Sequence, residues 1–599
     1  MLAIDFADNG DLQCRLDTYP RVRSPKYDTV SYWWGNDKET VSIICNGFEI
    51  QIRRTLLILL KALKYRRNPS RYLWIDAICL NQADNDEKAV QVPLMAKIYK
   101  RASSIIMWLG PPAVDLERAL IFLVEGARAW IESNVDCDEE QKSVALQVLQ
   151  DSGEMKVLCA FLSRPWFRRL WCLQEVLLSN DLYFLCHTPR IPFLSWKKVH
   201  DSVKYLQSHI GFLVQSSTED RDQRSILKIS EGVSYTIAFM EHYRTWMKIS
   251  QDIGAANILF FVNNRQCSEP VDRVWGMLGL LAHQLVDQIR AKGIIDYSED
   301  GKKEYWKAYE KFLIAVYEYD AAEFWTIVLT DIGRERHSLL PSWCPDFNRP
   351  TRYWAIDRAG EFRAGFVDSK DRSKIESTLS PSGCLSVSGF QVDKVVKITS
   401  VCRWIDPKTD EEGEELLRQT KVFLSECRAL RGTRNDDMEG MKSLCCTLLA
   451  ANENKSEGTS SLRSWPRAHQ ALEDALSQTV GDDLDTVTSL NGKRNEEYCN
   501  RLWQVSNGRK LFTTLHGRIG LGPLDLQADD AICAINGAEA LCVLRVAEGF
   551  SEWLSGRVRP PRSLSMKYKL IGDAYVYGLM HGQAFTVHGT GPKQHFEVI

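Results

Sequence analysis

A carboxylate, an aromatic ring and an arginine occur at helical spacing in RPWFRRLWCLQEV, residues 164–176. If this stretch is one helix, residues three, four and seven apart share a face. That face carries Arg168, Trp171, Cys172 and Glu175. Trp171 would raise the pKa of the Glu175 carboxyl group and Arg168 would lower it, and a carboxylate so placed can stabilise a developing oxocarbenium ion. The alternative is that Glu175 pairs with Arg168 or Arg169 and only fixes the helix.

Further polar side chains lie in and after the apolar run 73–80, which predicts a strand buried on both faces of a parallel sheet. Asp76 interrupts this run, and Asn81 and Gln82 follow it. Open α/β sheets bind ligands beyond the carboxyl ends of their strands, which makes all three candidate ligand-binding residues. The structural alternatives are that Asp76 accepts hydrogen bonds from a loop, and that Asn81 and Gln82 close a turn.

Trp33, Trp34, Gly35 and Asn36 end an earlier predicted strand, residues 27–35. A glycine there lets the backbone approach a diphosphate, and a tryptophan can stack on the ring of a ligand. Because alternate residues of a strand face opposite sides, we expect one of the two tryptophans to belong to the core.

The elements that would position these residues form a strand–helix–strand unit over residues 73–110. Asp84, with Glu87 three residues later, predicts an N-cap and capping box for the helix. A second apolar run, residues 105–109, predicts the next strand, so that the whole is a βαβ unit with a right-handed crossover. Upstream, the Asn-Gly pair within residues 41–52 predicts a β-hairpin.

The order of these elements predicts an α/β domain with a parallel sheet over residues 24–190. Residues 1–23 have few core-forming side chains and are expected to be a peripheral lead-in. Helical patterns dominate residues 191–375. Short strands punctuated by glycine predict a β-rich module, a small barrel or sandwich, over residues 376–599, with a helical insert at about 411–506.

Composition excludes several other classes of protein. A chain of 599 residues exceeds what one core supports, and a net charge of −3 argues against broad binding of nucleic acid or anionic membranes. The 17 cysteines form no C-x-x-C pair and the 11 histidines are dispersed, so no metal site is expected. Without a signal peptide or an apolar run long enough to span a membrane, the chain is predicted to be cytoplasmic.

Several stretches together resemble, in the same order, the fungal heterokaryon incompatibility (HET) family. They are YDTVSYWWG (27–35), LWIDAICLNQ (73–82), Gln91-Val92 with Met95, Ile98-Tyr99, WLG (108–110) and RPWFRRLWCLQEV (164–176). Stretches at 267–280, 340–347, 508–523 and 568–582 look like the body and C-terminal module of long HET proteins. Pro93 departs from the family pattern, and it marks either a helix start or an interior kink.

A second resemblance concerns chemistry. YDTVSYWWGND (27–37) is similar to the opening strand and loop of TIR domains, and WCLQEV (171–176) to their W-C-x-x-E-L helix. It implies a TIR-like, flavodoxin-like sheet. The glutamate that catalytic TIR domains need to cleave NAD falls on Glu175, which makes NAD+ the expected substrate. The surrounding candidates are Trp33, Trp34, Gly35, Asn36, Asp76, Asn81, Gln82 and Trp171.

These resemblances imply an incompatibility-type effector that triggers regulated cell death when non-self fungal partners fuse. NAD+ glycohydrolysis, switched on by self-assembly through the HET domain, would supply the toxicity. The alternative is a non-catalytic signalling adaptor that acts through protein–protein assembly. The sequence does not identify the incompatibility partner that would trigger either one.

Overall fold

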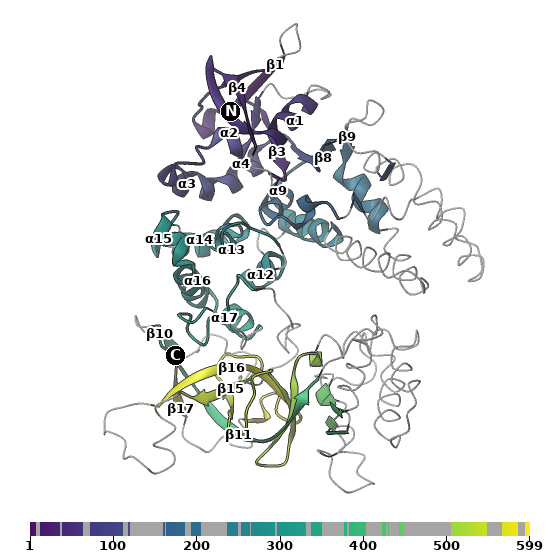
Figure 1. The fold of residues 1–599 in the computed structure, drawn as a ribbon. Helices are drawn as coiled ribbons and strands as arrows, with labels where there is room; N and C mark the ends of the chain where they lie inside the picture. The colour runs from purple at the N-terminus through teal and green to yellow at the C-terminus, as the bar shows by residue number, and fades with distance from the viewer. Residues whose placement is uncertain are drawn as a thin grey trace, which may run out of the picture. The chain divides into compact units, whose positions relative to one another are not determined.

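A computed structural model provides the fold (Figure 1). It describes residues 1–6, 12–35, 39–63, 72–111, 118–119, 160–161, 163–185, 193–204, 237–249, 253–263, 265–293, 296–330, 337–349, 364, 377–379, 383–402, 422–423, 425–426, 429, 443–444, 446–448, 505–547, 566–584 and 593–599. The chain divides into two compact units, Met1–Tyr305 and Trp306–Ile599. The boundaries expected at residues 190 and 375 therefore fall inside these units.

The first unit is built on a mixed nine-stranded sheet in the order β5-β4-β2-β1-β6-β3-β7-β8-β9. Its strands are β1 (Leu2–Phe6), β2 (Leu12–Leu16), β3 (Tyr27–Tyr32), β4 (Thr40–Cys45), β5 (Phe48–Arg53), β6 (Tyr72–Trp74), β7 (Ile105–Trp108), β8 (Leu182–Leu185) and β9 (Phe193–Ser195). Strands β6, β3, β7 and β8 are parallel neighbours. Outside this centre β2 and β4 are also parallel, whereas the other pairs are antiparallel, so the expected parallel sheet is confirmed only in part.

Strand β3 is buried along its whole length because helices cover both faces of the sheet. Val30 and Tyr32 belong to the hydrophobic cluster that α1 (Arg54–Ala62) packs against. Ser31 points the other way, as strand alternation requires, and donates a hydrogen bond to Glu175 of α9 (Cys172–Leu178). Helix α4 (Met95–Arg101) packs against α9. The strand end that carries the candidate site is therefore held from both sides.

Two local predictions are confirmed. Strands β4 and β5 form the expected hairpin, and its turn residues Asn46 and Gly47 have φ of 53° and 80°. Asp84 caps α3 (Asn85–Gln91) by accepting a hydrogen bond from the Glu87 backbone N–H at 3.0 Å. The Glu87 side chain accepts from the Asn81 N–H at 3.3 Å and not from the Asp84 N–H, so the N-cap is confirmed but the second bond of the predicted capping box is not formed.

The N-terminal residues differ from the expected peripheral lead-in. Strand β1 pairs with both β2 and β6, and Leu2 is fully buried in the core. The prediction was wrong for residues 2–6 and 12–16, because both segments form strands that are stabilised by pairing with other strands.

The strand predicted over residues 73–80 is also shorter than expected. It ends at Trp74, and Asp76 opens a helical turn, α2 (Asp76–Cys79), whose Ala77 N–H donates to its Asp76 Oδ1 at 2.8 Å. Pro93 lies in η3 (Val92–Leu94), a 3-10 segment between α3 and α4, and so interrupts the expected helix.

The helix predicted to run from Phe167 to about Leu178 is interrupted as well. A 3-10 turn, η5 (Pro165–Arg168), is followed by an extended Arg169 that forms a β-bridge with Gln266, and only then does α9 begin. This break turns Arg169, rather than Arg168, toward the strand ends.

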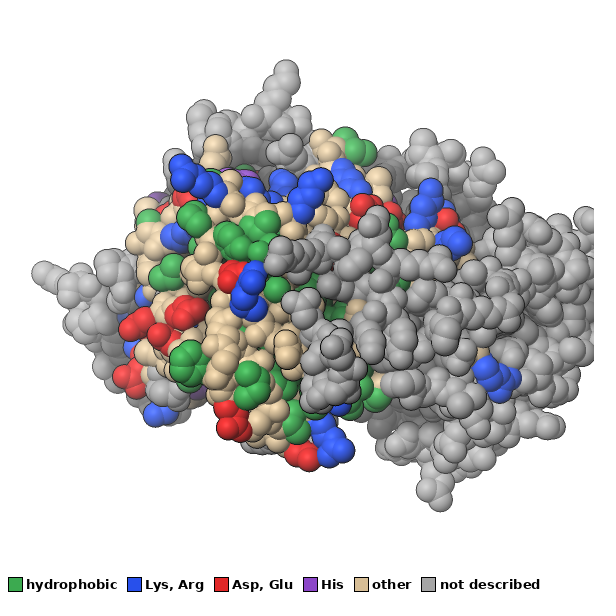
Figure 2. Space-filling model, turned by 90° about the horizontal axis from the view of Figure 1, so that it is seen from above, with side chains coloured by type: hydrophobic (Ala, Val, Ile, Leu, Met, Phe, Trp, Pro, Cys, Tyr) green, Lys and Arg blue, Asp and Glu red, His purple; other side chains and the backbone are tan. Residues whose placement is uncertain are grey.

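Helices follow the sheet within the first unit. They comprise residues 196–204 and 237–249, α12 (Ala255–Asn263), α13 (Asp272–Trp275), η6 (Leu278–Leu280), α14 (His283–Ala291) and α15 (Glu299–Lys303). Segment η6 packs on α4 and α9. On the face seen in Figure 2, basic and acidic side chains are interspersed over the described residues.

The second unit begins with α16 (Tyr305–Tyr319) and α17 (Ala321–Val328). Its strands are β10 (Ser377–Leu379), β11 (Leu385–Val401), β12 (Lys510–Thr514), β13 (Ile519–Gly522), β14 (Ala531–Ile535), β15 (Leu541–Val546), β16 (Lys567–Val576) and β17 (Gln594–Val598). Because β11 pairs with both β12 and β14, the largely antiparallel sheet closes on itself, as the barrel prediction expected. Most of the predicted helical insert lies outside the described residues. Among those that are described, no helix is long and apolar enough to cross a membrane.

Segment η6 packs closely on the sheet domain, so a larger side chain at Gly279 should lower the stability of the protein. A Cβ on Gly279 would come within 2.7 Å of Gln174 Oε1 and closer still to the Ala96 methyl group. Gly279→Ala should therefore lower the free energy of unfolding by about 1–3 kcal/mol through overpacking. Denaturant unfolding followed by tryptophan fluorescence measures the change.

The matched control is the double variant Ala96→Gly/Gly279→Ala, which removes the nearest clash. The double variant should be more stable than Gly279→Ala, although the glycine at position 96 of α4 itself costs about 1 kcal/mol. A Gly279→Ala protein that unfolds at the wild-type denaturant concentration would show that this packing is loose.

Candidate functional site

A cavity of about 500 Å³ opens at the carboxyl ends of β3 and β6, and we call it the strand-end cavity. This volume lies in the range of small-molecule sites. The lining residues come from two parts of the first unit. They are Trp33, Trp34, Gly35, Arg53, Asp76, Leu80, Gln82, Lys88, Val92, Met95, Pro165, Arg169 and Trp171 from the sheet domain, and Gln266, Cys267, Ser268, Glu269, Asp272, Tyr297 and Lys302 from the segment that follows it.

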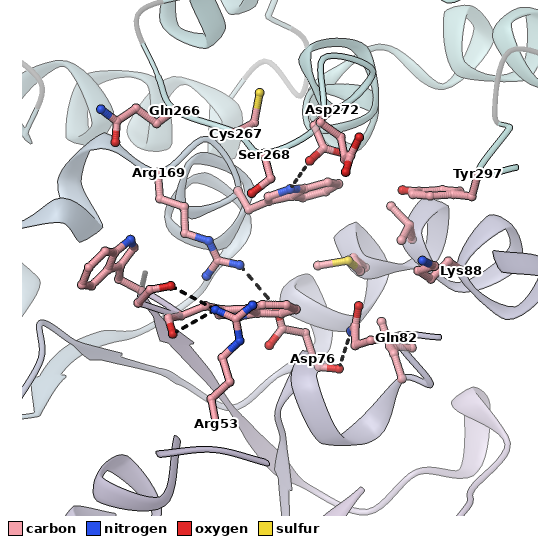
Figure 3. A pocket seen from close by; sticks show the side chains of 18 of the residues that line it. Arg53, Asp76, Gln82, Lys88, Arg169, Gln266, Cys267, Ser268, Asp272 and Tyr297 are labelled. Carbon is pink, nitrogen blue, oxygen red and sulfur yellow. Dashed lines mark hydrogen bonds and ion pairs between the residues drawn. The ribbon is translucent and has the colours of Figure 1, made fainter. Parts of the chain in front are cut away.

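One end of the cavity, which we call the basic end, is formed by two guanidinium groups and a tryptophan. Arg53 and Arg169 each lie 5.5 Å from the centre of the Trp34 ring. Figure 3 shows both arginine side chains on the same side of the cavity. Arg53 also donates to the Gly35 carbonyl oxygen at 3.0 Å, and Gly35 has a φ of 83° that favours glycine. An anionic group and a planar ring are the ligand parts that such an end can hold.

Arg169 connects this end to the carboxylate in the floor of the cavity. Its guanidinium lies 3.6 Å from Asp76 Oδ2 and donates a hydrogen bond to the Tyr32 carbonyl oxygen. Gln82 donates to the Asp76 carbonyl oxygen at 3.0 Å, which fixes the turn after β6. Burial raises the pKa of Asp76, and the positive charge of Arg169 opposes that shift. Asp76 therefore has both roles that the sequence left open, as a lining residue and as a structural acceptor.

Glu175 lies in the interior and does not line the cavity. It is 1% exposed, and its carboxylate accepts hydrogen bonds from Ser31 and, at 3.4 Å, from the Tyr99 hydroxyl group. Trp166 Nε1 donates to Ser31 Oγ at 2.7 Å. This arrangement satisfies the carboxylate with neutral donors from β3 and α4, as a buried charge requires.

Burial raises the pKa of Glu175, while the nearby Arg169 guanidinium opposes the shift. Burial works to lower the pKa of Arg169, but the carboxylates of Glu175 and Asp76 outweigh it and the pKa is raised. The buried carboxylates of Glu175 and Asp76 thus both interact with the positive charge of Arg169. Cys172, beside them, has a pKa raised well above its usual value by burial, which leaves it a structural thiol.

The other end of the cavity, which we call the acidic end, is formed by Asp272, Tyr297 and Trp171. Trp171 Nε1 donates to Asp272 Oδ2 at 3.2 Å, which Figure 3 marks with a dashed line. Burial raises the pKa of Asp272 to about 7. The Lys88 ammonium group faces the Tyr297 ring and is 5.8 Å from its centre.

The structure brings together most of the candidates that the sequence indicated. Trp33, Trp34, Gly35, Asp76, Gln82 and Trp171 all line the strand-end cavity. Asn81 does not line it, because its side chain accepts a hydrogen bond from the Ala83 N–H at 3.1 Å and closes the turn. Asn36 lies outside the described residues. The catalytic role of Glu175 stays a prediction, with its carboxylate placed behind the cavity wall.

Sequence reasoning missed Arg53, Arg169 as a lining residue, and Asp272 and Tyr297 at the acidic end. Arg53 ends β5, and no local pattern relates β5 to the loop after β3. Asp272 and Tyr297 are a hundred or more residues away from Trp171, although the stretch CSEPVDRVW that contains Asp272 was among the matched motifs. The described residues contain no cluster of histidine, cysteine, aspartate and glutamate that could hold a metal ion.

Comparison with known proteins shows what the sequence is similar to. The sequence model of the Heterokaryon incompatibility protein (HET) family matches residues 27–175, which begin at β3 and end at Glu175. The chain is 23% identical to heterokaryon incompatibility protein 6, OR allele, of Neurospora crassa, and the alignment covers 96% of this chain and 92% of that protein. No solved structure matches the chain. Residues 27–175 therefore match the HET family, and we call them the matched HET domain, within a chain similar along nearly its whole length to a heterokaryon incompatibility protein.

Proposed function

We propose that this chain is an incompatibility effector whose HET domain binds NAD+ in the strand-end cavity and cleaves its nicotinamide–ribosyl bond, which leads to cell death. The observation that carries the proposal is the composition of the cavity. Two guanidinium groups on the Trp34 ring suit a diphosphate next to a planar base, and about 500 Å³ suits a nucleotide.

The strand order supports a TIR-like architecture. Taken in chain order, the four parallel strands β3, β6, β7 and β8 are arranged second-first-third-fourth. This is the order in which flavodoxin-like sheets begin, and such sheets bind ligands beyond the carboxyl ends of their strands. The strand-end cavity lies at that edge, next to Gly35 and Asp76.

In this proposal Glu175 stabilises the ribosyl cation that develops as nicotinamide leaves. Glu175 then has to reach the ligand, so side chains of the cavity wall must move aside when the protein assembles or binds its ligand. Asp76 is the alternative carboxylate, because it already lines the cavity beside Arg169. Comparing variants of the two acids separates these roles.

The second candidate function is a non-catalytic adaptor. One observation favours it, namely that Glu175 is 1% exposed and held by Ser31 and Tyr99. A carboxylate so enclosed can serve to lock β3, α4 and α9 together without any chemistry. In that case the HET domain would act by binding a partner protein.

Glu175→Gln tests catalysis. This substitution keeps the shape of the side chain and removes its negative charge, so cleavage should fall by about 100-fold or more. The measurement is nicotinamide released from NAD+ by concentrated full-length protein, with Asp76→Asn run in parallel. If assembled wild-type protein releases no nicotinamide and Glu175→Gln leaves toxicity in cells unchanged, the adaptor is correct.

Arg53→Gln tests the binding site separately from catalysis. Removal of this guanidinium should weaken NAD+ binding by about tenfold, equivalent to about 1.4 kcal/mol, because a cation beside the ligand's anionic group is lost. Calorimetric titration of the full chain measures the affinity.

The neighbouring Arg54→Gln is the matched control. Arg54 is paired with Glu39 at 2.8 Å, outside the cavity, and its side chain is 59% exposed. The Arg54→Gln variant should bind NAD+ with the affinity of the wild type. Equal affinity of the Arg53 and Arg54 variants would argue against a nucleotide at the basic end.

A further inference from the structure

The acidic end of the strand-end cavity is built by residues outside the matched HET domain. The family match ends at residue 175, whereas Gln266, Asp272 and Tyr297 come from the following helical segment. The cavity is therefore composite, and a HET domain that ended at residue 175 would lack one wall of it.

Backbone and side-chain bonds hold this segment in a fixed register against the HET domain. Gln266 N–H donates to the Arg168 carbonyl oxygen at 2.7 Å, and Leu170 N–H donates to the Gln266 carbonyl oxygen at 2.9 Å. In helix α9, Gln174 Nε2 donates to the Gly276 carbonyl oxygen at 2.6 Å. Asp272 lies between these two anchor points, so its position in the cavity is set by the fold.

Asp272 has an oxygen left for a ligand. Its Oδ2 accepts from Trp171 Nε1, and among the described residues its Oδ1 has no hydrogen-bond partner. Asp272 is 9% exposed and lines the cavity. A nearly buried carboxylate oxygen without a partner favours a ligand that supplies an N–H or O–H donor.

Tyr297 provides an independent observation at the same place. Its hydroxyl group is buried without a hydrogen-bond partner among the described residues, and the side chain is 7% exposed. Figure 3 shows Tyr297 and Asp272 on the same side of the cavity, across from Arg53. A hydroxyl group that can donate, close to a carboxylate oxygen that can accept, matches a ring edge that carries both an N–H donor and an acceptor.

We infer that Asp272 and Tyr297 bind the exocyclic amino edge of the nucleotide's ring, so that the segment after the HET domain determines which nucleotide this chain accepts. The inference rests on the proposed function and names the part of the ligand that the acidic end recognises. Two sources share the required chemistry in NAD+, the 6-amino group of adenine and the carboxamide of nicotinamide. Each presents an N–H donor beside an acceptor on a planar group.

The test compares three ligands on the full chain by calorimetric titration, in the cold, with chromatography to verify that each ligand is intact. They are NAD+, its hypoxanthine analogue, in which a carbonyl replaces the adenine amino group, and its nicotinic acid analogue, in which a carboxylate replaces the carboxamide. The pH is kept above the value of about 7 at which Asp272 ionises. Wild-type protein should bind one of the two analogues at least about tenfold more weakly than NAD+, and that analogue identifies the bound edge.

In Asp272→Asn the affinities for NAD+ and the weaker analogue should differ by no more than about threefold, or their order should reverse. The reason is that Trp171 still donates to the amide oxygen, and the amide nitrogen then faces the ligand. Tyr297→Phe should also reduce the discrimination while folding normally, because it removes a hydroxyl group that has no partner among the described residues. Asp287→Asn is the matched control from the same segment, since its side chain is 75% exposed, and it should discriminate as the wild type does.

Two results would overturn the inference alone. One is wild-type protein that binds all three ligands within threefold. The other is tenfold discrimination that persists in both the Asp272 and the Tyr297 variants. Wild-type protein that binds none of the three ligands would instead overturn the proposed nucleotide site, and the inference with it.

Discussion

The position of Arg169 connects the separate parts of the first unit. Its guanidinium lies 3.6 Å from Asp76, packs on the Trp34 ring and lies in the field of Glu175, while its backbone forms a bridge with Gln266. Two buried carboxylates need a compensating cation, and a cation in the interior needs them in turn. The strand ends, the helix with Glu175 and the segment after the HET domain therefore all meet at this one residue, whose side chain also lines the strand-end cavity.

In this arrangement only some residues of the family motifs line the cavity, among them Trp34, Asp76 and Trp171. Glu175 and Ser31 belong to conspicuous motifs, yet both are buried and hold the domain together. The cavity is lined by other motif residues, after β3 and β6 and before α9, and by a segment that starts about ninety residues beyond the matched domain. A HET domain with its following helices is thus the smallest part of this chain in which the cavity is complete.

Local chemistry explains what the sequence could predict. The Asn46-Gly47 turn and the Asp84 cap depend on neighbouring residues and were both identified. Strand β1 and the interruption at Arg169 depend on partners far away in the sequence, β6 and Gln266, so periodicity could not reveal them. For the same reason the motif located Glu175 correctly but could not tell whether its carboxylate faced the cavity, and Asp272 was recognised only as part of a motif.

The account depends most on the claim that a nucleotide occupies the strand-end cavity with one group at Arg53 and its ring at Asp272. The most direct measurement is an experimental structure of the full chain with NAD+ or its cleaved product bound. The account predicts ligand density against Trp34 with an anionic group at Arg53 and an amino edge at Asp272. Density only at another site, with the cavity filled by solvent, would contradict it.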